Sequence, residues 1–250
     1  MLLRLAGPLQ SWGERSAFAA ERDSAAFPTR SALIGMFAAA EGRSRNHSPD
    51  HYAALEFIVR IDRPGTRIID YHTVGGGNTK DQTVATAGGS HKGNAVITRR
   101  HYLADAVFVI AVNGPPDDIT RIAHALREPH WAPYLGRRAC PPDEPLLLRA
   151  HVDNPITELR TKVPLSSPSS AAQPTGTLPV EFLWEHQPGN ARAASETFAV
   201  NDIPISFAPH ERRYGKRTLI RTVEQLPSAL RPPRDEMQQR LIDYALEHAA

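Results

Sequence analysis

The sequence contains a single cysteine, Cys140, among 250 residues. One cysteine excludes an internal disulfide and any zinc site built from several cysteines, and it suits a reducing compartment. No apolar run approaches the roughly 20 residues that a membrane-spanning helix needs. The first stretch is too short and too interrupted by Gly7 and Pro8 for a signal peptide. We therefore expect a cytoplasmic protein whose Cys140 fills space in the core, with a nucleophilic thiol as the alternative.

Strong net charge is also missing. The chain has 29 Lys and Arg against 27 Asp and Glu, which leaves a formal charge of +2. Its hydrophobic content of 41% and charged content of 22% are those of an ordinary globular protein with one large domain or two small ones. Bulk charge does not indicate a nucleic-acid ligand, so any such surface must come from local clustering of basic residues.

The sequence lacks the usual catalytic motifs. It has no GxxxxGK[ST], HExxH or GxSxG segment, and VGGGNTK has incomplete spacing for a phosphate loop. Asp117 and Asp118 open a predicted helix, where carboxylates favour the helix dipole more readily than they form a metal site. The eleven histidines include no pair at helical ligand spacing. We therefore expect no metal or cofactor.

The hydrophobic pattern alternates between strands and helices over the first three fifths of the chain. It predicts strands over 2–7, 54–62, 104–114 and 144–152, and helices over 31–41 and 117–127. A Gly-, Thr- and Asn-rich insertion over 71–102 separates the second strand from the third, and insertions of this length are usually functional or disordered. This order predicts an α+β fold with a ferredoxin-like (RRM-like) βαββαβ palm over residues 1–152.

The rest of the chain is harder to interpret. We expect a linker over 153–179, whose part from 162 to 179 is rich in Ser, Pro and Ala, and then a smaller β-rich C-terminal subdomain over 180–250. PVEFLWEH and FAVNDIPISFAP are candidate strands. Residues 235–248 predict an amphipathic terminal helix.

Basic residues gather in three places. Aromatic and histidine side chains lie among them, a mixture that suits a nucleic-acid backbone with stacked, unpaired bases. Ordinary solvated faces are the alternative. The clusters are Arg60, Arg63, Arg67, Lys80, Lys92, Arg99 and Arg100 in and around the insertion, then Arg137 and Arg138, then Arg212, Arg213, Lys216, Arg217 and Arg221.

The stretch FPTRSALIGMFAAAEG places Arg30 in the first turn of a predicted helix. Pro28 and Thr29 suit a helix start, because proline has no N–H to lose and threonine can cap. An arginine adds positive charge to an end that already prefers anions. Either Arg30 reaches solvent, or it binds a phosphate together with the free N–H groups. Gly35 within this helix predicts close packing against a sheet.

One chemistry stays open, which is metal-free cleavage of RNA. It requires a base near the 2′-hydroxyl and a cation at the phosphate, and Tyr71, His72 and Lys92 could supply them. We favour the interpretation that the same residues bind RNA without cleaving it.

Five segments, in order over about residues 2–150, resemble the CasD family of type I-E CRISPR Cascade subunits, which belongs to the RAMP superfamily. They are LRLAGPLQSWG, FPTRSALIGMFAAAEG, DYHTV, TRRHYLADAVFVIAV and PYLGRRACPPDEPLL. The segment VNDIPISFAPHERRYGKRTLIR resembles the C-terminal part of the family more loosely. The stretch 162–179 and the tail after about Pro227 resemble nothing in it.

The resemblance implies a RAMP palm with a thumb formed by 71–102. Such subunits bind the 5′ handle of the CRISPR RNA, cap the backbone filament of CasC subunits and contact the large subunit CasA, in a ribonucleoprotein complex of antiviral defence. The thumb would lie beside the target DNA. Another subunit, CasE, cuts the precursor RNA in type I-E systems, whereas the related type I-C subunit is itself a metal-free endoribonuclease. The resemblance therefore implies a noncatalytic subunit, with processing of the CRISPR precursor RNA as the alternative.

With RNA as the implied ligand, Arg30 becomes a predicted phosphate site. We expect RNA contacts from the loop after the first strand, the start of the first helix and the thumb. We also expect them from the LGRR turn, residues 135–138. Core packing is an equal alternative for the indole of Trp12. The predicted contact residues are Gln10, Ser11, Trp12, Thr29, Arg30, Ser31, Tyr71, His72, Thr73, Lys92, Arg99, Arg100, Tyr102, Arg137 and Arg138.

Overall fold

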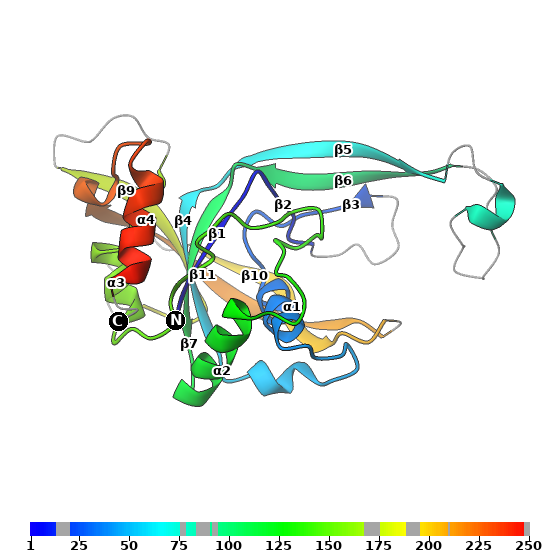
Figure 1. Cartoon of the computed structure of the whole chain (residues 1–250), viewed down its shortest axis with the longest axis horizontal. Helices are drawn as coiled ribbons and strands as arrows, with labels where there is room; N and C mark the ends of the chain where they lie inside the picture. The colour runs from blue at the N-terminus through cyan, green and yellow to red at the C-terminus, as the bar shows by residue number, and fades with distance from the viewer. Residues whose placement is uncertain are drawn as a thin grey trace.

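The structure is a computed structural model, and it describes residues 1–13, 21–75, 79–83, 91, 95–167, 176–188, 196–209 and 211–247. The protein has a body built around one antiparallel sheet and a long two-stranded arm that projects from the body (Figure 1). The predicted mixed α+β class is confirmed.

Seven strands form the central sheet in the order β10-β11-β9-β4-β7-β1-β8. Four of them, β8-β1-β7-β4, are the strands predicted for the palm, and this order is compatible with the ferredoxin-like arrangement, which stays a prediction. The bounds are β1 Leu2–Ala6, β4 Glu56–Arg63, β7 Val107–Asn113, β8 Leu147–Arg149, β9 Thr177–Trp184, β10 Glu196–Ser206 and β11 Arg213–Pro227.

Helices cover both faces of this sheet (Figure 1). Helices α1 (Arg30–Ala40) and α2 (Pro116–Arg127) cover one face, and α3 (Pro155–Thr161) and α4 (Met237–Leu246) cover the other. Short 3-10 turns occur at η1 (Pro49–Tyr52), η2 (Lys80–Gln82) and η3 (Ser228–Leu230). None of the helices in the described part of the chain has both the length and the apolar character needed to cross a membrane.

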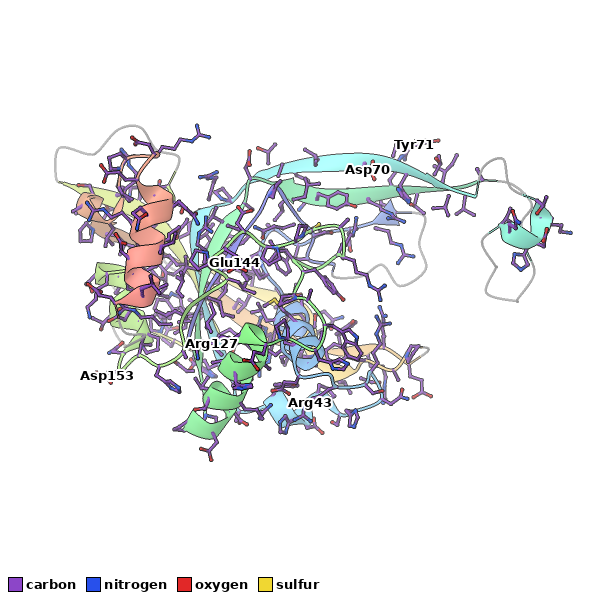
Figure 2. All side chains as sticks on the ribbon, viewed as in Figure 1. Arg43, Asp70, Tyr71, Arg127, Glu144 and Asp153 are labelled. Carbon is purple, nitrogen blue, oxygen red and sulfur yellow. The ribbon has the colours of Figure 1, made fainter. Side chains whose placement is uncertain are left out.

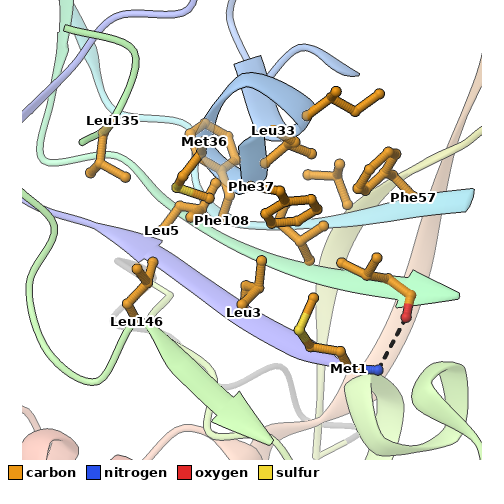
Figure 3. Packing of buried hydrophobic residues seen from close by; sticks show 14 of the residues in the cluster. Met1, Leu3, Leu5, Leu33, Met36, Phe37, Phe57, Phe108, Leu135 and Leu146 are labelled. Atoms are coloured by element: carbon orange, nitrogen blue, oxygen red, sulfur yellow. Dashed lines mark hydrogen bonds between the residues drawn. The ribbon is translucent and has the colours of Figure 1, made fainter. Parts of the chain in front are cut away.

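Alternating side chains of the central strands supply two separate cores. Leu3 and Leu5 of β1 face α1, where Figure 3 shows them near Leu33 and Phe37, while Leu2 belongs to the core under α3 and α4. This division follows from the two-residue period of a strand, which sends successive side chains to opposite faces. Both faces are apolar, so β7 forms an almost continuous hydrophobic run, as its sequence predicted.

The C-terminal strands extend the palm's own sheet. Strand β9 pairs directly with β4, with Ile58 opposite Trp184 and Ile61 opposite Glu181. Strands before and after the expected linker over 153–179 therefore lie in one sheet, while the predicted division into two domains stays a prediction. Part of that expected linker forms α3, where the Asn154 side chain accepts from the Thr157 N–H. The Ser/Pro/Ala-rich stretch over 168–175 lies outside the described residues.

The arm occupies the predicted insertion but begins earlier. Strands β5 (Thr66–Val74) and β6 (Val96–Ala104) pair from Thr66 opposite Ala104 to Val74 opposite Val96. Near the body, β2 (Leu9–Gln10) and β3 (Glu21–Arg22) also pair with β6. Gly65, with φ of +76°, makes the bend from β4 into the arm, because a β-carbon there would lie 2.7 Å from the Ala104 oxygen.

Candidate nucleic-acid interface

Arg30 lies at the start of α1, as predicted, but its charge is neutralised inside the protein. Its backbone N–H donates to Asp202 Oδ2 at 2.7 Å, and its guanidinium forms an ion pair with Glu185 at 2.9 Å. The residue is only 8% exposed, and its guanidinium carbon lies 5.1 Å from the Phe57 ring centroid. The anion that this helix start attracts is therefore the Asp202 carboxylate. We leave Arg30 out of the interface described below.

Arg217 completes this buried cluster. Its guanidinium donates to both oxygens of Asp202, at 2.6 and 2.8 Å, and it also contacts Glu185. We call Arg30, Glu185, Asp202 and Arg217 the four-charge network. Its two positive and two negative charges balance, and it ties the start of α1 to β10, to β11 and to the end of β9. Arg217 belongs to the third basic cluster of the sequence. The sequence of that cluster did not predict that Arg217 would pair with Asp202 and Glu185.

Arg60, from the first basic cluster, also has an internal role. Its side chain is fully buried and forms an ion pair with Asp62 at 2.7 Å. It also donates to the backbone oxygens of Leu159, Val163 and Pro164. Arg60 therefore stabilises the end of α3 and the chain after it, so it is not part of a basic surface.

The predicted contact residues Gln10, Ser11 and Trp12 are buried. The Gln10 amide donates to the Leu5 and Ala106 oxygens at 3.1 and 2.8 Å, and Trp12 Nε1 donates to Gln10 Oε1 at 3.2 Å. Trp12 is 1% exposed and belongs to the core beside α1. The core-packing alternative for Trp12 thus accounts for its position.

This buried loop supports the LGRR turn. The Ser11 N–H donates to the Leu135 oxygen at 3.0 Å. Gly136 has φ of +84°, and a β-carbon there would lie 1.7 Å from the Ser11 oxygen. Only glycine fits so close to another backbone. The loop after β1 therefore fixes the turn that carries Arg137 and Arg138.

Four arginines lie together where the arm meets the body. Arg22 on β3 lies opposite Arg100 on β6. Arg137 Nη2 donates to the Arg22 oxygen at 3.1 Å, and its guanidinium carbon lies 4.6 Å from the Tyr102 ring centroid. Arg138 is the next residue and is exposed. We call Arg22, Arg100, Arg137 and Arg138 the basic strip. Three of these arginines, and Tyr102 beneath them, are residues that the sequence predicted for RNA contact.

A groove of about 1120 Å³ continues from the strip across the outer face of α1. We call it the α1 groove. Four arginines and no aspartate or glutamate are found among the described residues that line it. Small side chains form its floor and aromatic side chains its walls. The principal lining residues are Ala32, Gly35, Ala38, Ala39, Arg43, Arg45, His47, Tyr52, Trp131, Tyr134, Arg138, Phe207, Arg212 and Tyr214.

The groove's arginines differ in their partners. Arg43 contacts Glu41 at 2.5 Å, so its charge is balanced. Arg45, Arg138 and Arg212 are exposed and make no ion pair with any residue that the structure describes. Three free positive charges on a lining without carboxylates make the groove an anion-attracting surface.

Only some of the groove's lining residues were predicted from the sequence. Arg138, Arg212 and Tyr214 were in the predicted basic clusters, but Arg45 and Trp131 were not. A usable signal was present in GRSRNHS, residues 42–48, and in HWAPYLGRR, residues 130–138, where basic and aromatic residues mix in loops. The two loops are far apart in the sequence, so the sequence did not show that both of them border α1.

The predicted thumb residues lie on the arm, away from this groove (Figure 2). Tyr71 is 61% exposed and lies opposite Arg99, while His72 lies opposite Thr98. Because Tyr71 and His72 are consecutive in a strand, their side chains project from opposite faces of the arm. Thr73 is exposed, and Lys92 lies outside the described residues.

Thr29 and Ser31 belong to the start of α1. Thr29 is the N-cap, and its hydroxyl accepts from the Ala32 N–H at 3.4 Å and lies 3.3 Å from the Ser31 hydroxyl. Thr29 is 2% exposed, which leaves it no access to a ligand in this structure. Its role here is local stabilisation of the helix.

Cys140 lies below the LGRR turn and is 1% exposed. Burial raises the pKa of the Cys140 thiol, and the nearby Arg137 charge opposes that shift only in part. A buried thiol held in its neutral form is a poor nucleophile. This agrees with the expectation that Cys140 fills space.

Comparison with known proteins supports one family. The family model described as "CRISPR-associated protein (Cas_Cas5)" matches residues 1–220. Among curated proteins, the chain is 36% identical over 162 residues to the CRISPR system Cascade subunit CasD of Escherichia coli (strain K12), covering 59% of this chain and 69% of CasD.

Solved structures agree with this match. A chain of a CRISPR RNA-guided surveillance complex is 44% identical, with 98% of each chain covered and a TM-score of 0.86. A chain described as a crystal structure of a Cas protein is 29% identical, with 93% of this chain and 97% of that chain covered and a TM-score of 0.62. The protein therefore belongs to the Cas5 family of CRISPR-associated proteins, as its resemblance to the CasD subunits of type I-E Cascade predicted.

Proposed function

We propose that this protein is a noncatalytic CRISPR RNA-binding subunit of a type I-E Cascade surveillance complex. Its family, its identity to a Cascade subunit and its likeness to a chain of an RNA-guided surveillance complex support this role. The protein would grip the 5′ handle of the CRISPR RNA in the cytoplasm and take part in antiviral defence.

The observation that carries the proposal is that three exposed arginines, Arg45, Arg138 and Arg212, line one surface without an ion-pair partner among the described residues, in a protein with a net charge of only +2. The basic strip and the α1 groove adjoin through Arg137 and Arg138, and the described lining of the groove contains no carboxylate. Phosphate contacts from arginine supply most of the affinity for a nucleic acid, independently of its sequence. We therefore place the RNA backbone along the strip.

Assembly contacts belong to the same proposal. The chain would cap a filament of CasC subunits, contact the large subunit CasA and hold its arm beside the target DNA. The length and exposure of the arm support this, because Ile69, Tyr71 and Ile97 are 58%, 61% and 46% exposed on it. An apolar arm surface of this kind is usual where a partner is bound.

The arrangement of the arm favours binding over cleavage. A metal-free nuclease needs a base and a cation that converge on one phosphate. Tyr71 and His72 project from opposite faces of the arm. His72 instead lies near Asp70, with 3.8 Å between Nδ1 and Oδ2. This placement on opposite faces supports binding of RNA without cleavage.

Binding of a repeat-derived RNA tests the proposal. The double variant Arg100→Ala/Arg138→Ala should weaken affinity at constant salt by about 2–4 kcal/mol if each side chain makes one charge-assisted contact. Arg127→Ala is the matched control, because Arg127 is an exposed arginine on α2 outside the strip and the groove lining. An unchanged affinity in the double variant would contradict the proposal.

Cleavage is assayed on the same samples. Incubation of the protein with the repeat RNA in the presence of a chelator should leave the RNA intact. A specific cut that disappears in His72→Ala would instead establish the endoribonuclease.

A further inference from the structure

We propose that the α1 groove binds unpaired nucleotides of the RNA, with their bases stacked on Trp131 and its neighbouring aromatic side chains and with Gly35 leaving room beneath them. This inference rests on the proposed function and assigns a ligand class to one part of that surface.

The side of the groove formed by α1 has mostly small side chains. Five α1 residues line the groove: Ala32, Gly35, Ala38 and Ala39 have at most one side-chain carbon, and the longer Met36 is buried. Gly35 was expected to pack closely against a sheet, which is wrong, because a β-carbon there would meet nothing within 4 Å. Glycine weakens a helix relative to alanine, and no neighbour in the protein requires it here. The open space above Gly35 therefore serves the groove.

The walls offer surfaces for stacking. Trp131 is 50% exposed, and it meets His130 edge-on with ring centroids 4.5 Å apart and an angle of 83°. Tyr134, Phe207 and Tyr214 also line the groove. Exposed aromatic rings beside free cations are the usual platform for unpaired bases, since every base has a stacking face.

The charge and size of the groove both favour a polynucleotide. Arg45, Arg138 and Arg212 line it without ion pairs to the described residues, so the groove offers cations to more than one phosphate. Its volume of about 1120 Å³ exceeds the usual range for a small-molecule pocket. Several linked nucleotides fit this space better than one free nucleotide.

Filling the groove tests the inference. In Gly35→Phe the new ring enters open space, so the fold is retained while the ligand's room is lost. We expect its affinity for a single-stranded, repeat-derived RNA to fall at least tenfold by fluorescence anisotropy at constant salt. Gly35→Ala is the matched control and should bind within twofold of the unmodified protein, because neighbouring floor residues are already alanine.

Removing the Trp131 ring is a second, independent test of the inference. Trp131→Ala should lower affinity about tenfold, and Trp131→Phe should recover most of it, because a ring can still stack. Trp131 is half exposed, so its loss does not open the core. Far-UV circular dichroism and thermal unfolding of each variant establish that the fold is intact.

The outcomes separate the two proposals. If Gly35→Phe and Trp131→Ala bind like the unmodified protein while Arg100→Ala/Arg138→Ala loses affinity, the groove inference is overturned and the proposed function stands. If the double variant also binds normally, the proposed function itself is overturned. A blunt RNA duplex of the same sequence that binds as tightly as the single strand would also overturn the groove inference.

Discussion

The start of α1 and the junction of the arm with the body both concentrate arginines, but they use them in opposite ways. In the four-charge network, Arg30 and Arg217 are matched by Glu185 and Asp202, which are 8% and 1% exposed at their side chains. In the basic strip and the α1 groove, Arg138 and Arg212 have no carboxylate partner among the described residues. The number of arginines in a sequence segment thus says little about binding until their acidic partners are known.

The difference lies in where the acidic residues fall in the chain. Asp202 and Glu185 are 172 and 155 residues from Arg30 along the sequence. They reach it only because β9, β10 and β11 extend the palm's sheet. A charge that is paired in this way contributes to the fold, whereas an unpaired exposed charge is available to a ligand. Variants that remove paired or unpaired arginines and their partners test that division.

Breaking the four-charge network should have the largest effect. Asp202→Ala removes the acceptor of the Arg30 N–H and one of the two carboxylate partners of Arg217, so the free energy of unfolding should fall by about 3–5 kcal/mol. Urea denaturation measures this change. Asp153→Ala is the control, because Asp153 is exposed and makes no ion pair with the described residues. Equal stability in the two variants would remove the structural role that we assign to the network.

Displacing the LGRR turn should have the next largest effect. Gly136→Ala places a β-carbon 1.7 Å from the Ser11 oxygen, so the turn must move and carry Arg137 and Arg138 away. We expect a loss of about 2–3 kcal/mol in stability from the strained backbone and the clash, together with weaker RNA binding.

Gly176→Ala separates the two causes in that experiment. Gly176 also has a positive φ, of +68°, but no atom of the described residues lies within 4 Å of its β-carbon position. This control should therefore lose only about 1 kcal/mol from backbone strain, with RNA affinity unchanged. If Gly136→Ala behaves in the same way as Gly176→Ala, the turn does not depend on the contact with Ser11.

Neutralising one exposed groove charge should have a smaller effect. Arg212→Ala should weaken RNA binding by about 1 kcal/mol and leave the urea midpoint unchanged, because Arg212 is exposed and has no ion-pair partner among the described residues. Isothermal titration with the repeat RNA gives the first quantity. A variant that loses stability instead would show that Arg212 supports the fold.

The smallest effect concerns Cys140. Because burial raises the pKa of its thiol, the neutral form is favoured in the folded protein. Iodoacetamide should therefore label Cys140 slowly near neutral pH and rapidly once urea unfolds the chain. The sign for stability follows, since the contribution from the neutral thiol is present at low pH and is lost as the pH rises through the raised pKa. Rapid labelling of the folded protein would contradict the buried position.

Local patterns were sufficient for much of the fold. The alternation in 54–62 and the apolar run in 104–114 predicted β4 and β7 within two or three residues, because burial leaves a direct periodic trace. Pro28 and Thr29 marked the start of α1 for another reason, since proline has no N–H to lose and threonine can cap a helix. The resemblance of five segments to one family then gave the function class that periodicity could not.

The pairing of strands and charges that are far apart in the chain could not be predicted from the sequence. Nothing in the composition of 180–187 shows that β9 will pair with β4, or that Glu185 will meet Arg30. The Arg60 side chain was predicted at a basic surface and is instead buried against Asp62. The alternation of side chains along β4 did not predict whether Arg60 would be buried, because helices cover both faces of the sheet. In the candidate site, sequence reasoning therefore found Arg100, Arg137 and Arg138 but missed Arg45 and Trp131.

The salt dependence of RNA affinity tests the central division most directly. Each exposed arginine that contacts a phosphate contributes about 0.7 to the slope of log K against log salt for a single strand. Arg138→Ala should therefore reduce the slope by about that amount, whereas Arg30→Ala should lower stability and leave the slope unchanged. A slope that falls in Arg30→Ala and stays constant in Arg138→Ala would contradict the account.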